Sequence, residues 1–481
     1  MESGELPRLS SIKNQNCFSS LKSVIPPHTA PGWTSITTGV NPGKHGIYYF
    51  YNFSTSPPTI TNAANSSTPR IWNYVESLKE NSVVVNVPIT YPVQKISGAI
   101  ISGIPPWYLD EKSVYPLELF EKLKTESYEL DTPMSKSLAK RPDVLVNRLV
   151  ATEEKRVNAF LDLLKDNEWS FGMIVITALD RLQHKLLGKG EKESKEVRRC
   201  YREIDALVGR IIDFLGSGVN VLVVSDHGFN PRPLAFYPNV WLHEHGLLER
   251  KSSIRYHLER SLHNVFDGHF LWLPQRMTRR FQGGGSPVVY KIDAIDLVSS
   301  RAYVPGTDGI IVAKSKEDQK LIVSGLSKLK DESGKEICSV YSRDQVYRGE
   351  KLDCAPELLI IPRDDVNIRT DPFSRSIISR SGDFAKANHS PNGIFFATGP
   401  DIGKAESLDI SLEDIAPTAL ALMGIRPPES MDGQVIQEIM LEPRPMKTLK
   451  IANVTGDERA YLFSEKDEEL VMENLKRLGY T

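Results

Sequence analysis

Short apolar runs alternate with longer amphipathic segments through the first half of the chain. The apolar runs are rich in β-branched residues, which is typical of buried strands in a parallel sheet, and they lie at 83–87, 171–177 and 221–224. Apolar positions at helical spacing predict amphipathic helices before and between them, at 71–79, 151–164 and 196–215. This alternation of strand and helix predicts a doubly wound α/β fold with a mostly parallel sheet.

The rest of the chain follows this rhythm less closely. Residues 1–23 predict a single helix followed by a segment at the edge of the sheet. Residues 98–150 and 230–310 contain Pro-rich or Gly-rich loops, and we interpret both as insertions. Further elements are predicted downstream, with strands at 310–312, 358–361 and 394–397 and a helix at 411–422.

The composition narrows the class of protein. Of the 481 residues, 40% are hydrophobic and 25% are charged, as in ordinary globular proteins. The formal net charge of −2 gives no electrostatic argument for binding nucleic acid or an anionic membrane. No apolar run approaches the roughly 20 residues that span a bilayer, and the N-terminus has no apolar signal region. The four scattered cysteines favour reduced thiols in a cytoplasmic protein.

Polar residues of particular chemistry follow the strand predicted at 221–224. Asp226 and His227 come next in the chain, before Gly228. Open α/β sheets place their chemistry just beyond the carboxyl ends of strands. A carboxylate oxygen beside an imidazole suits a divalent metal such as zinc. For the pair alone, local turn chemistry is the alternative.

A second pair follows the strand predicted at 171–177. Asp180 and His184 are four residues apart, so they share one face if this turn is helical. A carboxylate and an imidazole at this spacing can ligate one ion. The alternative is an aspartate that caps the helix and a histidine on its surface.

The segment around Thr29 adds a hydroxyl to this set. Prolines bar a helix before Pro31, and the pattern that follows predicts a short helix ending at Gly39. Thr29 lies at or just before the start of this helix, where unpaired N–H groups and the helix dipole favour an anion or an alkoxide. The alternative is that Thr29 is only an N-cap. The nearby His45 lies in a turn-rich loop and is interpreted as structural.

These candidates, together with His389 before the strand at 394–397, all adjoin predicted strand ends or turns. Parallel strands bring such points to one edge of the sheet. Two metal ions about 4 Å apart need this supply of oxygen and nitrogen ligands. A threonine beside such an ion is a competent nucleophile, because a bound cation lowers the pKa of a hydroxyl.

The order of these motifs resembles the type I phosphodiesterase/nucleotide pyrophosphatase family of the alkaline phosphatase superfamily. The resemblance extends from about Leu6 to Gly433. It rests on residues 25–39, 41–47, 180–184, 226–228 and 389–400, with further matches at 414–420 and 431–433.

The resemblance implies an alkaline-phosphatase-like α/β/α sandwich with inserted cap elements. Residues 1–440 would form the catalytic domain and 441–481 a charged tail. The implied activity is metal-dependent hydrolysis of phosphodiester or pyrophosphate bonds. The implied substrate is a small phosphate ester or a nucleotide-like molecule, with neither a nucleic acid polymer nor a membrane as partner.

The resemblance also implies a role for each candidate. Thr29 would attack phosphorus to form a phospho-threonine, which water then hydrolyses. Two divalent ions, zinc or else manganese, would be bound by Thr29, Asp226 and His227 on one side and by Asp180, His184 and His389 on the other. Asn52 would help to hold a phosphoryl oxygen.

One feature departs from the family pattern. Family members begin with a strand that ends in an Asp-Gly pair, and this aspartate binds the same metal as the nucleophile. Residues 1–28 contain no Asp, so we expect the sheet of this chain to lack that first strand. Either the true start lies upstream of Met1, or the chain is truncated and lacks both a core strand and a ligand.

Two alternative functions follow. A phosphomonoesterase or phosphonate hydrolase of the same superfamily remains open, because the choice of leaving group depends on the insertions. A truncated, metal-deficient binding protein is the non-catalytic alternative, and the absent aspartate supports it. A sulfatase is discounted, because Thr29 stands where those enzymes carry a modified Cys or Ser.

Overall fold

The computed structural model describes residues 4–52, 59–132, 138, 140–251, 294–380, 386–442 and 446–449, with isolated residues between 463 and 474. The chain folds into two compact units. The first consists of Met1–Pro231, Asp344–Ala355 and Lys386–Asn474, and the second of Arg232–Arg343, Pro356–Ala385 and Leu475–Thr481. The Gly-rich loop and most of the predicted charged tail lie outside the described residues.

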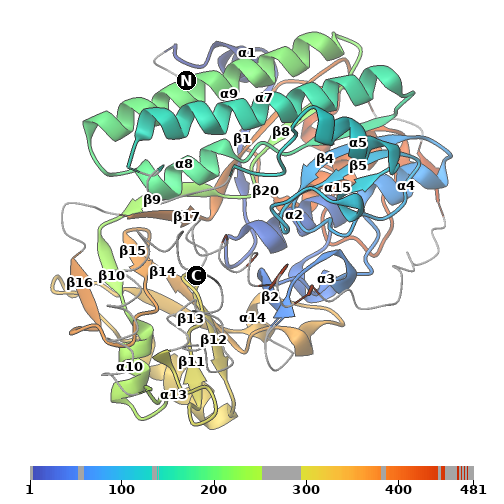
Figure 1. Cartoon of the computed structure of the whole chain (residues 1–481). Coiled ribbons are helices and arrows are strands. Elements are labelled where there is room, and N and C mark those ends of the chain that lie inside the picture. Colours follow the sequence, from blue (N-terminus) through green and yellow to red (C-terminus); the bar gives the residue numbers. More distant parts are fainter. Residues whose placement is uncertain are drawn as a thin grey trace, which may run out of the picture. The chain divides into compact units, whose positions relative to one another are not determined.

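The first unit contains two larger sheets (Figure 1). One has the order β6 (Val114–Tyr115), β5 (Gly98–Ser102), β4 (Ser82–Val87) and β7 (Phe171–Ile174). In it, β4 is parallel to both β5 and β7, and only β6 is antiparallel to its neighbour. This sheet confirms the predicted parallel strands at 83–87 and 171–177.

The other sheet of the first unit is mixed. Its order is β19 (Ala405–Glu406), β1 (Cys17–Lys22), β18 (Asn392–Thr398) and β8 (Val221–Val224), and β20 (Ile410–Ser411) also pairs with β1. The strand β18 is antiparallel to both β1 and β8, whereas β19 and β20 are parallel to β1. The prediction of an edge segment near residue 20 is therefore wrong. The partners of β1 come from the far end of the sequence, and a local sequence pattern cannot predict such a pairing. The prediction that residues 221–224 form a buried strand of a parallel sheet is wrong, because β8 is partly exposed and its described neighbour β18 is antiparallel to it.

The strands β7 and β8 differ from the interior strand β4. Every residue of β4 is buried, whereas the residues of β7 and β8 are at least partly exposed. Within the described residues, β7 pairs only with β4 and β8 only with β18. Each of the two sheets therefore ends on an apolar strand with one unpaired edge.

Helices cover these sheets, and two of them are long (Figure 1). Helices α7 (Pro142–Asp166) and α9 (Glu191–Leu215) lie against each other, and α8 (Ala178–Leu186) contacts both. Most of their buried positions are apolar and include Leu149, Val157 and Leu207, but Glu153 and Arg156 of α7 are buried as well. The remaining helices of this unit are α1 (Pro7–Gln15), α2 (Thr29–Thr38), α3 (Pro42–His45), α4 (Ile71–Ser77), α5 (Glu118–Thr125) and α15 (Ile415–Leu422).

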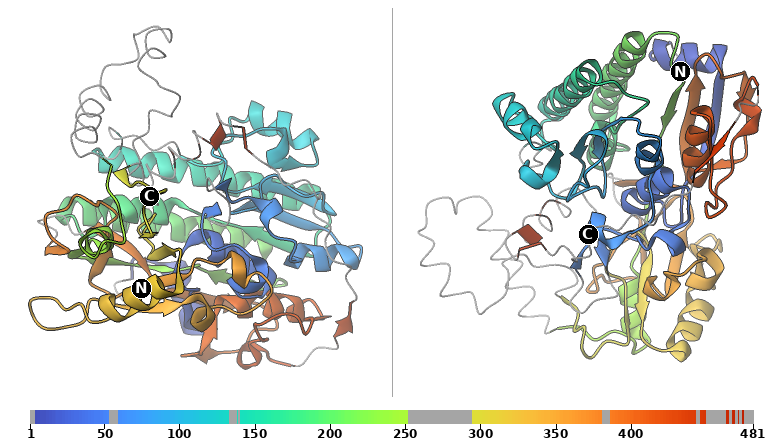
Figure 2. Two further views of the ribbon diagram at one scale, coloured as in Figure 1. Left: turned by 90° about the horizontal axis from the view of Figure 1, so that it is seen from below. Right: turned by 90° about the vertical axis from the view of Figure 1, so that its right-hand side faces the viewer.

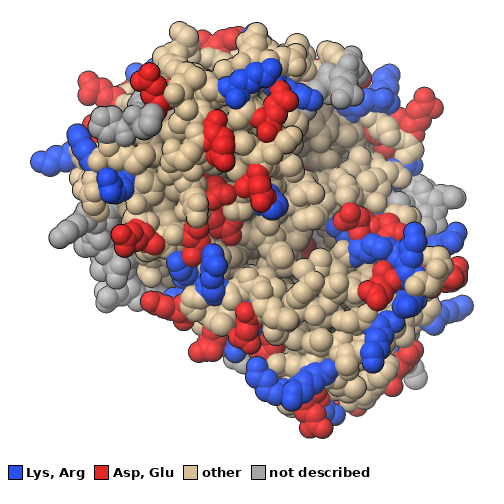
Figure 3. Space-filling model, turned by 180° about the vertical axis from the view of Figure 1, so that it is seen from behind, with Lys and Arg blue, Asp and Glu red and all other residues tan. Residues whose placement is uncertain are grey.

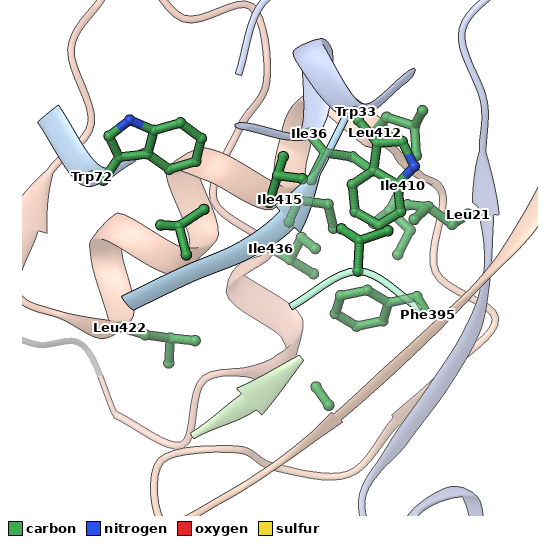
Figure 4. Close-up of a cluster of buried hydrophobic side chains, with 14 of the residues drawn as sticks. Leu21, Trp33, Ile36, Trp72, Phe395, Ile410, Leu412, Ile415, Leu422 and Ile436 are labelled. Carbon is green, nitrogen blue, oxygen red and sulfur yellow. The ribbon is translucent and has the colours of Figure 1, made fainter. Parts of the chain in front are cut away.

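A single apolar cluster joins α2 to the sheets (Figure 4). Trp33 and Ile36 of α2 pack with Leu412 and Ile415, and Phe395 of β18 belongs to the same cluster. All five side chains are at least nine-tenths buried, so the cluster fixes α2 against the mixed sheet. The described residues also form two-stranded sheets: β2 (Tyr51–Asn52) antiparallel to β3 (Thr59–Ile60), β9 (Gly228–Arg232) with β17 (Lys386–Ser390), and β21 (Ile425–Arg426) parallel to β22 (Lys447–Thr448).

The second unit has its own sheets and its own core (Figure 2). One sheet has the order β11 (Ala302–Tyr303), β12 (Ile310–Ala313), β14 (Leu358–Pro362) and β13 (Cys338–Ser342). The other has the order β15 (Val366–Ile368), β10 (Leu234–Phe236) and β16 (Ile378–Arg380). Helices α10 (Pro238–Glu244) and α13 (Lys316–Leu326) supply Trp241 and Ile322 to the core, and α14 (Arg343–Val346) leads the chain back to the first unit.

Candidate metal centre

Helix α8 presents Asp180 and His184 on one face, as their spacing predicts. The helix begins because Glu153 of α7 accepts hydrogen bonds from the backbone N–H groups of Thr177 and Ala178, at 2.9 Å and 2.8 Å. Glu153, which belongs to α7, therefore caps the N-terminus of α8 in place of a local N-cap side chain. The alternative role of Asp180 as the helix cap is excluded, because Asp180 lies inside the first turn.

His389 of β17 completes a cluster with these two residues. Its Nε2 lies 2.9 Å from His184 Nε2 and 3.6 Å from Asp180 Oδ1. His184 Nε2 lies 3.5 Å from the same oxygen. We call Asp180, His184 and His389 the ligand cluster, because one ligand atom from each lies within 4.8 Å of the others.

Hydrogen bonds to backbone carbonyls fix the tautomer of two imidazoles at this site. His389 Nδ1 donates to Pro27 O at 2.9 Å, and His227 Nδ1 donates to Gly228 O at 3.2 Å. In a neutral ring with its proton on Nδ1, Nε2 carries the lone pair. The Nε2 atoms of both rings are therefore ready to accept a proton or to bind a metal.

The electrostatics of the ligand cluster favour a charged carboxylate among neutral rings. Burial raises the pKa of Asp180, but His184, His389 and Arg181 outweigh this effect and hold the pKa well below its usual value. Burial, with His227 and His184 nearby, lowers the pKa of His389 to about 3. One anionic oxygen and neutral imidazoles are the forms that bind a divalent cation.

Asp226 and His227 follow β8 after Ser225, as the sequence predicts, and we call them the Asp226–His227 pair. His227 Nε2 lies 3.4 Å from Asp226 Oδ2 and 4.0 Å from Asp180 Oδ1, and its ring stacks on that of His389 with centroids 3.7 Å apart. Gly228 allows this turn, since a Cβ there would lie 2.2 Å from Asn392 O. The turn therefore brings the pair beside the ligand cluster.

Thr29 is the first residue of α2, and His28 rather than Thr29 is its N-cap. The ring of His28 accepts a hydrogen bond from the N–H of Ala30 through Nδ1, at 3.2 Å. Pro31 has no N–H, and Gly32 N–H donates to His28 O. The prediction that several unpaired N–H groups hold an anion here is wrong for these three positions. Neutralisation of an anion must come from other groups.

Contacts on both sides of Thr29 tie it to the candidate metal ligands. Two residues before it, Pro27 O accepts the hydrogen bond from His389. One turn after it, Gly32 packs on Asp226 so closely that a Cβ would lie 3.1 Å from Asp226 Cβ. Thr29 itself is 6% exposed. The segment that contains Thr29 therefore contacts both the ligand cluster and the Asp226–His227 pair.

Sequence reasoning missed residues that surround the ligands. The ring of Phe229 stands edge-on to His184 and His389, with centroids 4.8 Å and 5.1 Å away. Arg181 donates from Nη1 to Asp180 Oδ2. The sequence could have indicated these two residues only by their position next to the candidate ligands. Phe229 follows the Asp-His-Gly segment, and Arg181 follows Asp180.

Asn52 and His45, which the sequence analysis also considered, belong to neither the ligand cluster nor the Asp226–His227 pair. Asn52 lies in β2 and is half-buried. His45 is fully buried, accepts the Ile47 N–H through Nδ1 at 3.0 Å and lies 3.1 Å from Ser35 Oγ through Nε2. These bonds agree with the structural interpretation of His45.

The ligand cluster fits a divalent ion in both chemistry and size. Carboxylate oxygen and imidazole nitrogen are ordinary zinc ligands, and tetrahedral bonds of about 2.0–2.1 Å place ligand atoms roughly 3.3 Å apart. The three separations of 2.9, 3.5 and 3.6 Å bracket that spacing. Asp226 Oδ2 is buried and accepts no hydrogen bond from the described residues. A buried carboxylate oxygen in this position also suits a cation.

Solved structures with this fold define the class of protein. Phosphonoacetate hydrolase from Sinorhizobium meliloti 1021, in complex with phosphonoformate, is 15% identical, with a TM-score of 0.55 over 88% of this chain and 91% of that one. Human ectonucleotide pyrophosphatase/phosphodiesterase 5 is 13% identical, with a TM-score of 0.53 over 91% and 95%. The inactive murine form in complex with AMP is 11% identical, with a TM-score of 0.54 over 90% and 94%. The chain therefore has the alkaline-phosphatase-like α/β fold.

The sequence identifies the family within this class. Residues 1–382 match the type I phosphodiesterase / nucleotide pyrophosphatase model. The chain belongs to this family, which confirms the resemblance drawn from the motifs. No curated protein sequence matches the chain.

Three further observations concern the molecule as a whole. All four cysteines are free thiols. Among the helices that the structure describes, none combines the length and the apolar character needed to cross a bilayer. Acidic and basic side chains are interspersed on the face drawn in Figure 3, in keeping with the net charge of −2.

Proposed function

We propose that this chain is a metal-dependent hydrolase of phosphodiester or pyrophosphate bonds that uses Thr29 as its nucleophile. The observation that carries the proposal is that Thr29 begins α2 in a segment whose Pro27 contacts His389 of the ligand cluster and whose Gly32 packs on Asp226. Family membership supports the reaction class.

The ligand cluster would hold one divalent ion, and the Asp226–His227 pair with Thr29 would hold a second. Zinc suits these ligands best, and manganese is the alternative. When bound, such ions supply Lewis acidity and neutralise charge on the phosphoryl oxygens. Because the N–H groups of Ala30 and Gly32 already have acceptors in the chain, these two groups are not available for this neutralisation.

The chain's own residues divide the reaction into two steps. Thr29 Oγ1 bonds to phosphorus and the alcohol or nucleotide leaves, taking up a proton. Water then breaks the bond between Oγ1 and phosphorus, which releases the phosphate monoester and restores the threonine hydroxyl. Asn52 would contact a phosphoryl oxygen, and Phe229 would shield the imidazoles from bulk water.

The substrate is proposed to be a small phosphate ester or nucleotide-like molecule. One structural neighbour was solved with AMP, which supports a nucleotide-like substrate, whereas another is a phosphonoacetate hydrolase, which supports the alternative of a phosphonate hydrolase. The free thiols of all four cysteines support a cytoplasmic location.

The test is hydrolysis of an activated aryl phosphodiester, its matching monoester and phosphonoacetate, with added zinc or manganese. We expect the diester to be the best substrate and Thr29→Ala to lose roughly 10⁴-fold or more in kcat, as for other nucleophiles. Thr34→Ala is the matched control, because Thr34 lies on the same buried helix and bonds only to backbone.

Each other outcome has a definite meaning. Preference for the monoester or for phosphonoacetate would replace the diesterase by the alternative hydrolase. Bound metal without hydrolysis of any of the three would favour a binding protein. Equal losses in Thr29→Ala and Thr34→Ala would remove Thr29 from the nucleophile's role.

A further inference from the structure

A layer of buried charged residues lies directly behind Asp180, and the reaction just proposed makes no use of it. It consists of Asp131, Glu153, Arg156 and Arg181, whose side chains are at most 1% exposed. Charged side chains are almost never buried this deeply unless they are paired. The inference drawn from them rests on the proposed metal site but not on the proposed reaction.

Arg181 joins this layer to the ligand cluster. Its Nη1 donates to Oδ2 of Asp180. The other oxygen, Oδ1, is the one that lies 3.5 Å from His184 Nε2 and 3.6 Å from His389 Nε2. The two oxygens of one carboxylate therefore have different partners, and only Oδ1 is directed at the imidazoles.

Asp131 holds the opposite edge of the Arg181 guanidinium. Nε and Nη2 of Arg181 donate to Asp131 Oδ2 at 2.9 Å and 2.8 Å, and Trp107 Nε1 donates to the same oxygen at 3.1 Å. The planar guanidinium is thus held at three of its nitrogen atoms. A group fixed in this way has few orientations in which it can reach Asp180.

Arg156 and Glu153 anchor the far side of the layer. Arg156 Nη2 donates to Asp131 Oδ1 at 3.4 Å, and its Nη1 donates to Glu153 Oε1 at 2.8 Å. Glu153 in turn accepts from the first amides of α8, the helix that carries Asp180. The layer therefore positions both the side chain of Asp180 and the helix from which it projects.

The charges of the layer balance without Asp180. Its two guanidinium groups offset its two carboxylates, Asp131 and Glu153. The negative charge of Asp180 is in excess of this balance. A cation at the ligand cluster would therefore meet one uncompensated anionic oxygen.

We propose that Arg181 is a positioning residue that occupies Asp180 Oδ2, so that Asp180 can bind a metal ion through Oδ1 alone. Asp131 is the residue that holds Arg181 in place. The consequence is a site with one carboxylate oxygen and open coordination positions, rather than a site closed by a bidentate carboxylate.

Metal binding by the purified full chain tests this proposal without relying on catalysis. Affinity is measured by titration with Zn²⁺, and coordination by the visible absorption of the protein loaded with Co²⁺. We expect Arg181→Met to bind Zn²⁺ roughly 10- to 100-fold more weakly, as for other residues that orient a ligand. Its Co²⁺ spectrum should also change, because a second carboxylate oxygen becomes available.

Asp131→Asn, alone and combined with Arg181→Met in a double variant, tests whether Asp131 acts through Arg181. If Asp131 acts through Arg181, the double variant loses no more affinity than Arg181→Met alone. Arg148→Met is the matched control, since Arg148 lies on α7 and pairs with Glu129. The control should bind Zn²⁺ with the affinity of the unaltered chain. Thermal unfolding of each metal-free variant checks its fold.

The outcomes separate this inference from the proposals on which it rests. Unchanged Zn²⁺ affinity and an unchanged Co²⁺ spectrum in Arg181→Met would overturn the positioning role, and additive losses in the double variant would overturn the part given to Asp131. If Arg181→Met does not fold, Arg181→Lys takes its place, because it keeps the charge but lacks the planar guanidinium group. An unchanged Zn²⁺ affinity in Arg181→Lys would also overturn the positioning role of Arg181. A chain that binds no ion at all would overturn the metal site and this inference together. Absence of hydrolysis with normal metal binding would affect only the proposed reaction.

Discussion

The ligand cluster and the Asp226–His227 pair lie side by side, yet they differ in how complete they are. In the ligand cluster, three side chains from α8 and β17 direct ligand atoms within 4.8 Å of one another. In the pair, burial, with Asp180 nearby, raises the pKa of Asp226. One site is assembled and charged, whereas the other has a carboxylate in an unfavourable environment.

The difference between Asp180 and Asp226 shows how the buried charged layer affects the pKa of a candidate ligand. Asp180 is held by Arg181, and its pKa is well below the usual value although burial alone would raise it. Asp226 instead packs against Gly32 of α2, and its pKa is raised. The same residue type thus meets opposite electrostatic conditions within one centre.

The largest expected effect separates the two sites by their ligands. Asp180→Asn should weaken the binding of the first Zn²⁺ by on the order of 100-fold or more, since loss of a ligand exceeds loss of its supporting residue. Asp226→Asn should leave that first ion bound and reduce only the binding of a second. Calorimetric titration gives both affinities, with the exposed Asp162→Asn on α7 as control. Loss of both ions in Asp226→Asn would show that the ligand cluster and the Asp226–His227 pair do not bind metal independently.

The sequence could predict where the candidate ligands lie, because they are close to regular elements. Val221–Val224 reads as a strand, so the position of Asp226 and His227 after it could be predicted, and the spacing of Asp180 and His184 predicts their common helical face. The pairing of β1 with β18 could not be predicted in this way. It joins segments from opposite ends of the chain, and the polar residues of β1 suggest an edge.

The buried charged layer was also beyond the reach of local patterns. Arg156 and Glu153 occur in an amphipathic helix, where charged residues normally indicate the solvent side. Their burial depends on Asp131, which lies in a separate segment and supplies the compensating charge. Only the tertiary structure brings these groups together.

A smaller effect is expected where α2 touches the pair. In Gly32→Ala the new Cβ would lie 3.1 Å from Asp226 Cβ and 3.4 Å from Leu412 Cδ1, so Asp226 must shift by a few tenths of an ångström. Since a displacement of 1 Å in a catalytic group can cost 10²-fold, we expect a roughly three- to tenfold loss in affinity for a second ion. The first ion should bind unchanged. Gly218→Ala is the control, because no atom lies within 4 Å of a Cβ there. A loss confined to the first ion would contradict the assignment of Asp226 to the second.

The smallest effect on metal binding is expected at His45, a buried histidine outside both sites. Burial, with Arg70 nearby, lowers the pKa of His45 to about 3 in the folded protein, below its ordinary value of 6.5. The neutral ring therefore stabilises the fold above pH 6.5, and this contribution is lost as the pH falls from 6.5 towards 3, at up to about 1.4 kcal/mol per pH unit. In His45→Gln, the free energy of unfolding of the metal-free chain should fall less steeply over this range, while Zn²⁺ affinity at pH 7 stays unchanged. Denaturant unfolding at several pH values measures the slope. An unaltered slope would mean that His45 does not titrate differently on unfolding, whereas a loss of Zn²⁺ affinity would mean that the ligand cluster depends on residues well beyond its own buried layer.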